Sequence, residues 1–170
     1  VHQFPQILIS IDTFRSEVAE ACILKGAALI NDIAAGKLDD TMLNTIAKHN
    51  VPYIMMHMRG NPQTMQSLTE YQDVVKEMIL YFSERIAAAR SLGINDLIID
   101  PGFGFGKNLE QNLTMLANFS DFTYLGIPVL AGISRKSMLG KITGKDTNER
   151  VSSSIAAAIM AADRGAKIIR

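Results

Sequence analysis

The chain has 170 residues, and its 17 Lys and Arg side chains balance its 17 Asp and Glu side chains. This balance argues against the basic surface of a nucleic-acid-binding protein, and no apolar run approaches the roughly 20 residues of a membrane-spanning helix. Because hydrophobic residues make up 48% of the chain, we expect one soluble, cytoplasmic globular domain over residues 1–170, with no membrane contact.

Short apolar runs rich in Ile, Val and Leu alternate with longer segments in which apolar residues recur every three or four positions. This alternation predicts strands separated by helices. The runs are apolar on both faces, which indicates strands covered on both sides and hence a parallel sheet. We expect the strands at residues 7–11, 28–30, 53–56, 97–99, 129–133 and 167–169.

The segment between the third and fourth predicted strands shows the clearest helical spacing. The capping-box pattern of residues 69–72 is expected to open this helix and Gly93 to close it. The predicted apolar face carries Val75, Met78, Ile79, Phe82 and Ile86.

Polar residues follow nearly every predicted strand. In a parallel barrel the carboxyl ends of all strands share one rim, whereas a doubly wound sheet uses mainly its switch point. We therefore expect an α/β fold of the (β/α)8 TIM-barrel type. A complete barrel takes about 250 residues, so six strand-helix units predict an incomplete barrel and a piece of a longer protein. The polar residues in question are Asp12, Asn31, Asp32, His57, Asp100, Ser134 and Arg170.

Asp100 begins an octet, residues 100–107, in which Pro101 and three glycines interrupt the apolar pattern. Glycine gives up conformational entropy on folding, so this density is expected where backbone must approach a ligand. A second break, Gly-Ile-Ser-Arg-Lys-Ser at residues 132–137, follows the next strand. The apolar spacing after it predicts a helix, whose free N–H groups would favour an anion at the rim.

Simpler interpretations apply to several of these residues. A strand-end aspartate is often only the cap of the next helix; we keep that structural role for Asp32 and leave both roles open for Asp12. The octet is no Walker A motif, because Pro101 replaces its first Gly and Asn108 its Ser or Thr, and it also lacks the Rossmann spacing. His57 has no companion ligands at zinc-site spacing.

The strand-end motifs, in order, resemble those of the dihydropteroate synthase family. This resemblance implies a pterin-binding barrel that joins p-aminobenzoate to 6-hydroxymethyl-7,8-dihydropterin diphosphate in folate biosynthesis, releasing diphosphate. Sulfonamides imitate the p-aminobenzoate. The resemblance rests on residues 10–13, 30–33, 56–62, 100–107, 132–137 and 168–170.

A buried carboxylate such as Asp100 can accept both N–H groups on the pterin edge, and an amide can both donate and accept. The resemblance assigns p-aminobenzoate to Phe105, Lys136 and Ser137 and the diphosphate to Arg170. It implies no acid, base or nucleophile from the protein. Pterin binding is assigned to Asp12, Asn31, Ile33, Met56, Asp100, Phe105, Gly132, Lys136 and Arg170.

The resemblance also implies Mg²⁺ as cofactor, held by an Asn in an N-terminal segment without counterpart in these 170 residues, and a homodimer. We expect the chain alone to be weakly active or inactive. Two alternatives remain. A methyltetrahydrofolate-dependent methyltransferase barrel shares the Asp and Asn but lacks the Ser-Arg-Lys-Ser turn, and a non-catalytic pterin-binding module would need no further segment.

Overall fold

The computed structural model describes residues 3–4, 6–60, 63–64 and 69–170. Asn61 and Pro62, which belong to the motif of residues 56–62, lie outside the described residues. The strands are β1 (Ser10–Asp12), β2 (Leu29–Asp32), β3 (Tyr53–Met56), β4 (Leu97–Asp100), β5 (Leu130–Ala131) and β6 (Ile168–Ile169).

Helices separate the strands, as the sequence predicts. Within the described ranges, no helix is long and apolar enough to cross a membrane. The α-helices of the described residues are α1 (Ser16–Ile23), α2 (Met42–His49), α3 (Val74–Ser91), α4 (Leu109–Ala117), α5 (Ser137–Thr143) and α6 (Val151–Asp163), and the described 3₁₀ helices are η2 (Phe119–Leu125) and η3 (Thr147–Glu149).

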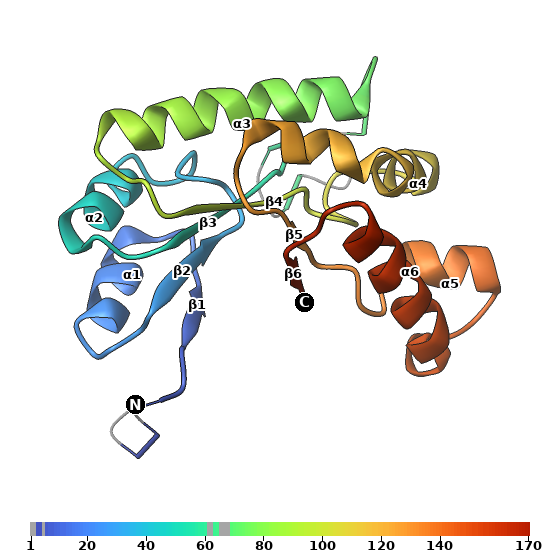
Figure 1. Ribbon diagram of the computed structural model, residues 1–170, viewed down its shortest axis with the longest axis horizontal. Coiled ribbons are helices and arrows are strands. Elements are labelled where there is room, and N and C mark those ends of the chain that lie inside the picture. The colour runs from blue at the N-terminus through green and yellow to red at the C-terminus, as the bar shows by residue number, and fades with distance from the viewer. Residues whose placement is uncertain (1–2, 5, 61–62, 65–68) are drawn as a thin grey trace.

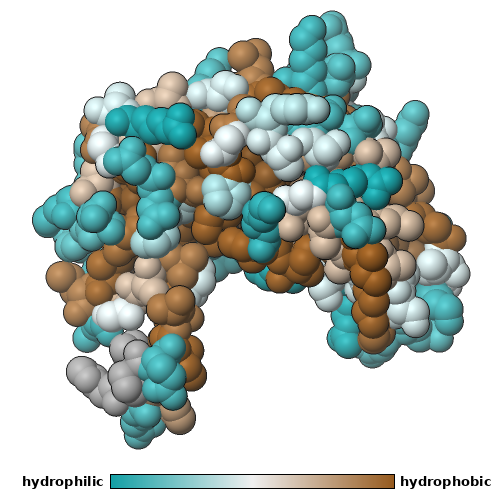
Figure 2. Space-filling model, in the orientation of Figure 1, coloured by the Kyte–Doolittle hydropathy of each residue, from teal (hydrophilic) through white to brown (hydrophobic). Residues whose placement is uncertain are grey.

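The strands lie side by side in chain order and all run parallel. β1 to β4 form one sheet, a parallel bridge between Ile99 and Val129 continues it, and β5 pairs with β6. A doubly wound sheet would reverse its order at a switch point, whereas a barrel wall adds each strand beside the last. The helices lie outside this wall, and its inner side is open as a wide hollow (Figures 1 and 2).

The first and fifth strands are shorter than predicted. Ile7 and Leu8 are exposed, because pairing with β2 begins only where Ser10 meets Leu29. The predicted strand at 129–133 keeps only two residues as β5, since pairing with β6 covers Leu130 and Ala131 alone. An apolar run therefore marks a strand's position better than its length.

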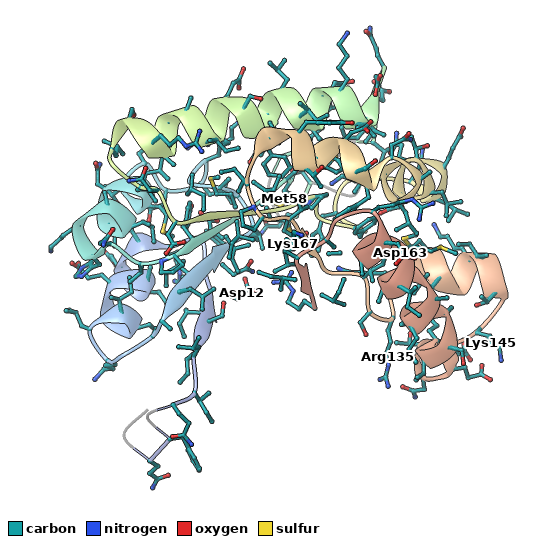
Figure 3. All side chains as sticks on the ribbon, viewed as in Figure 1. Asp12, Met58, Arg135, Lys145, Asp163 and Lys167 are labelled. Atoms are coloured by element: carbon teal, nitrogen blue, oxygen red, sulfur yellow. The ribbon has the colours of Figure 1, made fainter. Side chains whose placement is uncertain are left out.

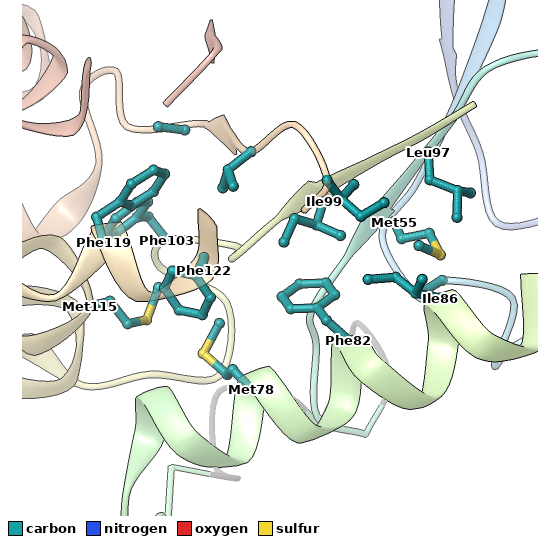
Figure 4. Packing of buried hydrophobic residues seen from close by; sticks show 14 of the residues in the cluster. Met55, Met78, Phe82, Ile86, Leu97, Ile99, Phe103, Met115, Phe119 and Phe122 are labelled. Carbon is teal, nitrogen blue, oxygen red and sulfur yellow. The ribbon is translucent and has the colours of Figure 1, made fainter. Parts of the chain in front are cut away.

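Helix α3 covers the sheet with the predicted apolar face. Met78 and Phe82 are fully buried, and Phe82 packs edge-on against Phe122 with ring centroids 6.5 Å apart. Figure 4 shows Phe82 pointing from α3 towards Ile99 and Met55 of the sheet. This core fixes the wall whose carboxyl ends carry the polar residues.

The predicted start of α3 at residues 69–72 is wrong. The carboxylate of Asp73 accepts from the backbone N–H of Lys76 at 3.0 Å, and Glu77 accepts from the N–H of Gln72 at 2.8 Å. These two acidic side chains therefore take over the cap. The carbonyl of Thr69 instead accepts a hydrogen bond of 2.6 Å from the side chain of Gln111 in α4.

Truncation of Phe82 tests this core. Phe82→Ala should lower the free energy of unfolding by about 3–5 kcal/mol, because it leaves a cavity between α3 and the sheet. Urea denaturation followed by circular dichroism measures the change. Leu80 on the same helix is 61% exposed, so Leu80→Ala is the matched control and should change stability by about 0.5 kcal/mol or less. Equal losses in the two variants would contradict this packing.

Candidate functional site

Asp100 lies at the carboxyl end of β4 with its side chain 1% exposed. One carboxylate oxygen accepts from the backbone N–H of Gly102 at 2.8 Å, and the other accepts from Nη2 of Arg170 at 2.9 Å. A carboxylate has about four lone-pair positions, so both oxygens can still accept from a ligand. The predicted pterin acceptor thus keeps capacity for two N–H donors.

The charges around Asp100 are mainly positive. Burial raises the pKa of the Asp100 carboxyl, while the Gly102 N–H and the cations Arg170, Lys136 and Lys107 act in the opposite direction. A ligand that donates two further hydrogen bonds would favour the ionised form. With several cations about one buried carboxylate, the site is suited to a ligand that carries both N–H donors and negative charge.

Gly132, just after β5, leaves room for the pair of Asp100 and Arg170. A Cβ atom at this position would stand 3.2 Å from Nη2 of Arg170 and 3.5 Å from Oδ2 of Asp100. A side chain at this position would therefore crowd the guanidinium of Arg170 first and the carboxylate of Asp100 next. The structure therefore brings Gly132 to Asp100 and Arg170, as the sequence predicts.

Asn31 carries an unpaired buried amide. Its side chain belongs to a residue that is 2% exposed, and within the described part of the chain neither Oδ1 nor Nδ2 has a hydrogen-bond partner. Most buried polar side chains are hydrogen-bonded, and one left without partners costs free energy. An amide with both functions unpaired at the carboxyl ends of the strands can donate to and accept from a ligand.

Asp12 lies beside Asn31, because the two residues are register partners at the ends of β1 and β2. Asp12 is exposed, and Figure 3 shows it at the end of β1 next to the open hollow. Its carboxylate is thus available at the same edge as Asn31. No described hydrogen bond ties it down as a helix cap.

Three predicted slot residues come together in a small apolar cluster. Ile33 and Phe105 pack against the buried cluster of Ala34, Met56 and Met58, although they come from loops after different strands. Nζ of Lys136 lies 4.3 Å from the centre of the Phe105 ring, a cation–π contact. Burial lowers the pKa of the Lys136 amine, and Asp100 opposes that shift. The cluster gives a flat ligand an apolar wall beside charged groups.

The turn of residues 134–137 contributes less than its composition suggests. The predicted helix begins at Ser137 as α5 and has only seven residues. The backbone N–H of Arg135 donates to Oγ of Ser154, and the Arg135 side chain lies far from Asp12 across the hollow (Figure 3). Ser137 is exposed at the start of α5. Lys136 is therefore the cation of this turn that acts on Asp100.

Asp32 has the structural role expected for it. Its two oxygens accept from the backbone N–H groups of Ala34 at 2.8 Å and Gly36 at 2.7 Å, and from the hydroxyl of Tyr53 at 2.6 Å. These bonds hold the loop that follows β2 and use three of the roughly four acceptor positions of the carboxylate. Asp32 thus fixes the loop directly after Asn31.

The family is decided by a match along the whole chain. The model of the family described as pterin binding enzyme matches residues 1–170. The chain belongs to the pterin-binding enzyme family. Dihydropteroate synthase of Synechocystis sp. (strain ATCC 27184 / PCC 6803 / Kazusa) is 45% identical over 167 residues, which cover 96% of this chain and 58% of that protein. The chain thus spans about three fifths of the length of this curated relative.

Solved pterin-binding enzymes share the fold. Dihydropteroate synthase from Stenotrophomonas maltophilia with active-site-bound imidazole superposes with a TM-score of 0.93 at 44% identity, covering 97% of this chain and 63% of that one. The enzyme from Xanthomonas albilineans in complex with 7,8-dihydropteroate gives a TM-score of 0.89 at 41% identity, covering 96% and 60%. The chain is accordingly an α/β partial barrel, as predicted.

Lys107, the last residue of the octet, is a feature that the sequence-based assignment of the pterin-binding site missed. It is 6% exposed, and Nζ donates to the carbonyls of Phe105 at 2.9 Å, Gly102 at 3.1 Å and His57 at 3.4 Å. The available signal was a cation directly after three glycines, with backbone carbonyls around it as acceptors.

His57 is buried against aromatic rings. Its ring meets that of Tyr81 edge-on with centroids 4.8 Å apart, and burial lowers its pKa to about 2, so the imidazole is neutral. Among the residues that the structure describes, no group of three or more His, Cys, Asp or Glu side chains is placed to hold a metal ion.

Substitution of Gly132 tests the geometry around Asp100. Gly132→Ala should displace the Arg170 guanidinium and weaken pterin binding about tenfold, because the new methyl group enters the space beside the pair. Isothermal titration calorimetry with a dihydropterin measures the affinity, and urea denaturation reports separately on the fold. A folded variant with unchanged affinity would show that this space is not needed.

Proposed function

We propose that this chain carries the pterin site of a dihydropteroate synthase. The enzyme joins p-aminobenzoate to 6-hydroxymethyl-7,8-dihydropterin diphosphate and yields 7,8-dihydropteroate and diphosphate. The observation that carries the proposal is the unpaired buried amide of Asn31 at the same sheet edge as the buried carboxylate of Asp100. Family membership and the likeness to dihydropteroate synthases support it.

In this proposal the polar side chains form hydrogen bonds along the edge of the pterin ring. Asp100 accepts the ring N–H and the 2-amino group in a charge-assisted pair, while Asn31 and Asp12 meet other ring positions. Lys136 donates to the carbonyl edge. Because Asp100 and Asn31 are buried, their hydrogen bonds select for the pterin. A ligand that lacked the matching group would leave a buried polar atom unpaired.

The apolar residues hold the ring between them. Ile33, Met56 and Phe105 supply the wall, and Gly132 leaves the opening in which Arg170 lies. The side chain of Arg170 is 46% exposed although it is paired with Asp100, so its guanidinium also has a free surface. We propose that this surface stacks on the pterin and contacts the diphosphate.

The reaction needs positioning and charge stabilisation more than proton transfer. The bond between the exocyclic methylene carbon and the diphosphate oxygen breaks, the electron pair leaves with the diphosphate, and the aromatic amine forms the new C–N bond and then loses a proton. Arg170 stabilises the leaving charge. Phe105, Lys136 and Ser137 hold p-aminobenzoate, with its carboxylate at the start of α5, and sulfonamides compete there.

Mg²⁺ is the cofactor that this reaction class implies, since diphosphate oxygens are its preferred ligands. The described residues include no cluster of acidic or imidazole ligands for the ion. We therefore derive no step of the reaction through it. The proposal for Mg²⁺ rests on the resemblance and on the substrate.

We also propose that the protein acts as a homodimer through α6. This helix exposes Val151, Ile155 and Ile159 by 48%, 56% and 56%. The three residues are four positions apart and therefore form one stripe, and Figure 2 shows hydrophobic side chains over this part of the molecule. An exposed apolar stripe of this kind is suited to pack against a second copy.

Removal of the buried carboxylate is the central test of the pterin site. Asp100→Ala should weaken binding of dihydropterin diphosphate by about 2–4 kcal/mol, because the N–H groups of the pterin lose a charged acceptor. Calorimetric titration measures this loss. Asp96 is exposed just before the same strand, so Asp96→Ala is the matched control and should bind normally. Equal affinities for the two variants would reject the assignment.

Lys136 is the proposed cationic donor to the carbonyl edge of the pterin. Lys136→Met should weaken binding of 6-hydroxymethyl-7,8-dihydropterin, measured by calorimetric titration, about tenfold, since the carbonyl edge loses a charged donor. Lys141 is exposed on α5, and Lys141→Met keeps the same change of charge outside the site. If both lysine variants lowered the affinity equally, net charge rather than a local contact would account for the effect.

A further inference from the structure

Lys107 is a buried cation with no bonded counter-ion in the described part of the chain. Its three acceptors are backbone carbonyl oxygens, one from His57 after β3 and two from Gly102 and Phe105 in the octet. A lysine amine is rarely this buried unless it is paired with acceptors, because the loss of water around its charge costs free energy. An ammonium group has three N–H donors, which matches the number of acceptors.

Two of these bonds fold the octet on itself, and the third, to the carbonyl of His57 at 3.4 Å, joins it to the end of the neighbouring strand. The octet backbone passes so close to β3 that a Cβ atom on Gly102 would stand 2.6 Å from the carbonyl oxygen of His57. In the middle of the octet the N–H of Gly104 donates to Oδ1 of Asn112 at 2.8 Å. Lys107, the last residue of the octet, reaches back to the carbonyls of Gly102 and Phe105.

The octet in turn holds Asp100. The Gly102 N–H donates to one carboxylate oxygen of Asp100, and the carbonyl of the same residue accepts from Lys107. Movement of Gly102 would therefore change both bonds at once. The positive charge of Lys107 also opposes the effect of burial on the pKa of Asp100 and so favours the carboxylate anion.

We propose that Lys107 is a positioning residue, whose ammonium group ties the octet to the end of β3 and so holds Asp100 ionised and aligned for the pterin. This inference rests on the proposed pterin function. Lys107 itself contacts backbone and no reacting atom. Its loss affects the ligand only through Gly102 and Asp100.

The hydrogen bonds of the Lys107 ammonium group to the octet and to β3 are expected to depend on pH, because they depend on its charge. Burial lowers the pKa of Lys107 to about 7; Asp100 on β4 opposes this shift, and Lys136 and Arg59 add to it. The imidazole of His57 stays neutral near this pH and does not titrate with it. As pH rises through this value the amine loses its proton and one donor. Pterin affinity should then fall while the pterin ring itself is unchanged.

The test measures binding of 6-hydroxymethyl-7,8-dihydropterin, which carries no phosphate whose ionisation would overlap the range. For the unaltered protein we expect affinity to fall about tenfold between about pH 6 and about pH 9. Lys107→Met should bind about tenfold more weakly at the lower pH and show no such fall. The exposed Lys141→Met is the control and should follow the unaltered protein.

Hydrogen exchange of the amides of Gly102, Gly104 and Gly106 provides a readout that needs no ligand. Exchange should be faster in Lys107→Met than in Lys141→Met. Unchanged exchange in the octet overturns the proposal, as does Lys107→Met binding with the affinity and pH profile of the unaltered protein. If Lys107→Met does not fold, Lys107→Gln takes its place in both measurements. The pH dependence of dihydropterin affinity in the unaltered protein is then judged as described above.

Failure of the proposed function looks different. In that case the folded, unaltered protein does not bind the dihydropterin at any pH, and Asp100→Ala changes nothing. Hydrogen exchange of the octet amides then still shows whether Lys107 ties the octet to β3. Faster exchange in Lys107→Met without pterin binding supports the tie but removes its link to the ligand, which overturns the proposal as stated.

Discussion

The site depends on keeping one carboxylate, that of Asp100, charged inside the protein. An isolated buried charge is costly, so it must be matched by donors and opposite charges. The Gly102 N–H, the Arg170 guanidinium and the more distant ammonium groups of Lys136 and Lys107 provide them. Several features of the carboxyl edge follow from this requirement, including the glycine that makes room for Arg170 and the glycines that bring backbone N–H groups close.

The parallel wall makes this arrangement possible from distant parts of the sequence. Asp100 and Arg170 are 70 residues apart in the chain but meet, since every strand ends at the same edge. The core under α3 holds the wall in shape. Parallel pairing of β1 with β2 then places exposed Asp12 in register with buried Asn31.

Much of this could be predicted from sequence. The alternation of apolar runs located the six strands that the structure describes, and the glycines after Asp100 pointed to the edge at which Asp100 and Arg170 meet. The cap of α3 was missed, because both Thr69 and Asp73 suit such a position and only the fold shows that Thr69 faces Gln111. Lys107 was missed because its partners are backbone carbonyls, which leave no side-chain pattern. The unpaired state of Asn31 likewise depends on three-dimensional surroundings and has no signature in the chain.

The unpaired amide of Asn31 also has a meaning for the evolution of this chain. A leucine of similar size at that position would remove the cost of a buried polar group and would make the free protein more stable. In the proposed pterin site, this polar side chain is therefore a position at which stability is exchanged for ligand recognition. Selection for stability alone would favour an apolar residue in place of Asn31 and so weaken the site, while the strands of the barrel wall would stay unchanged.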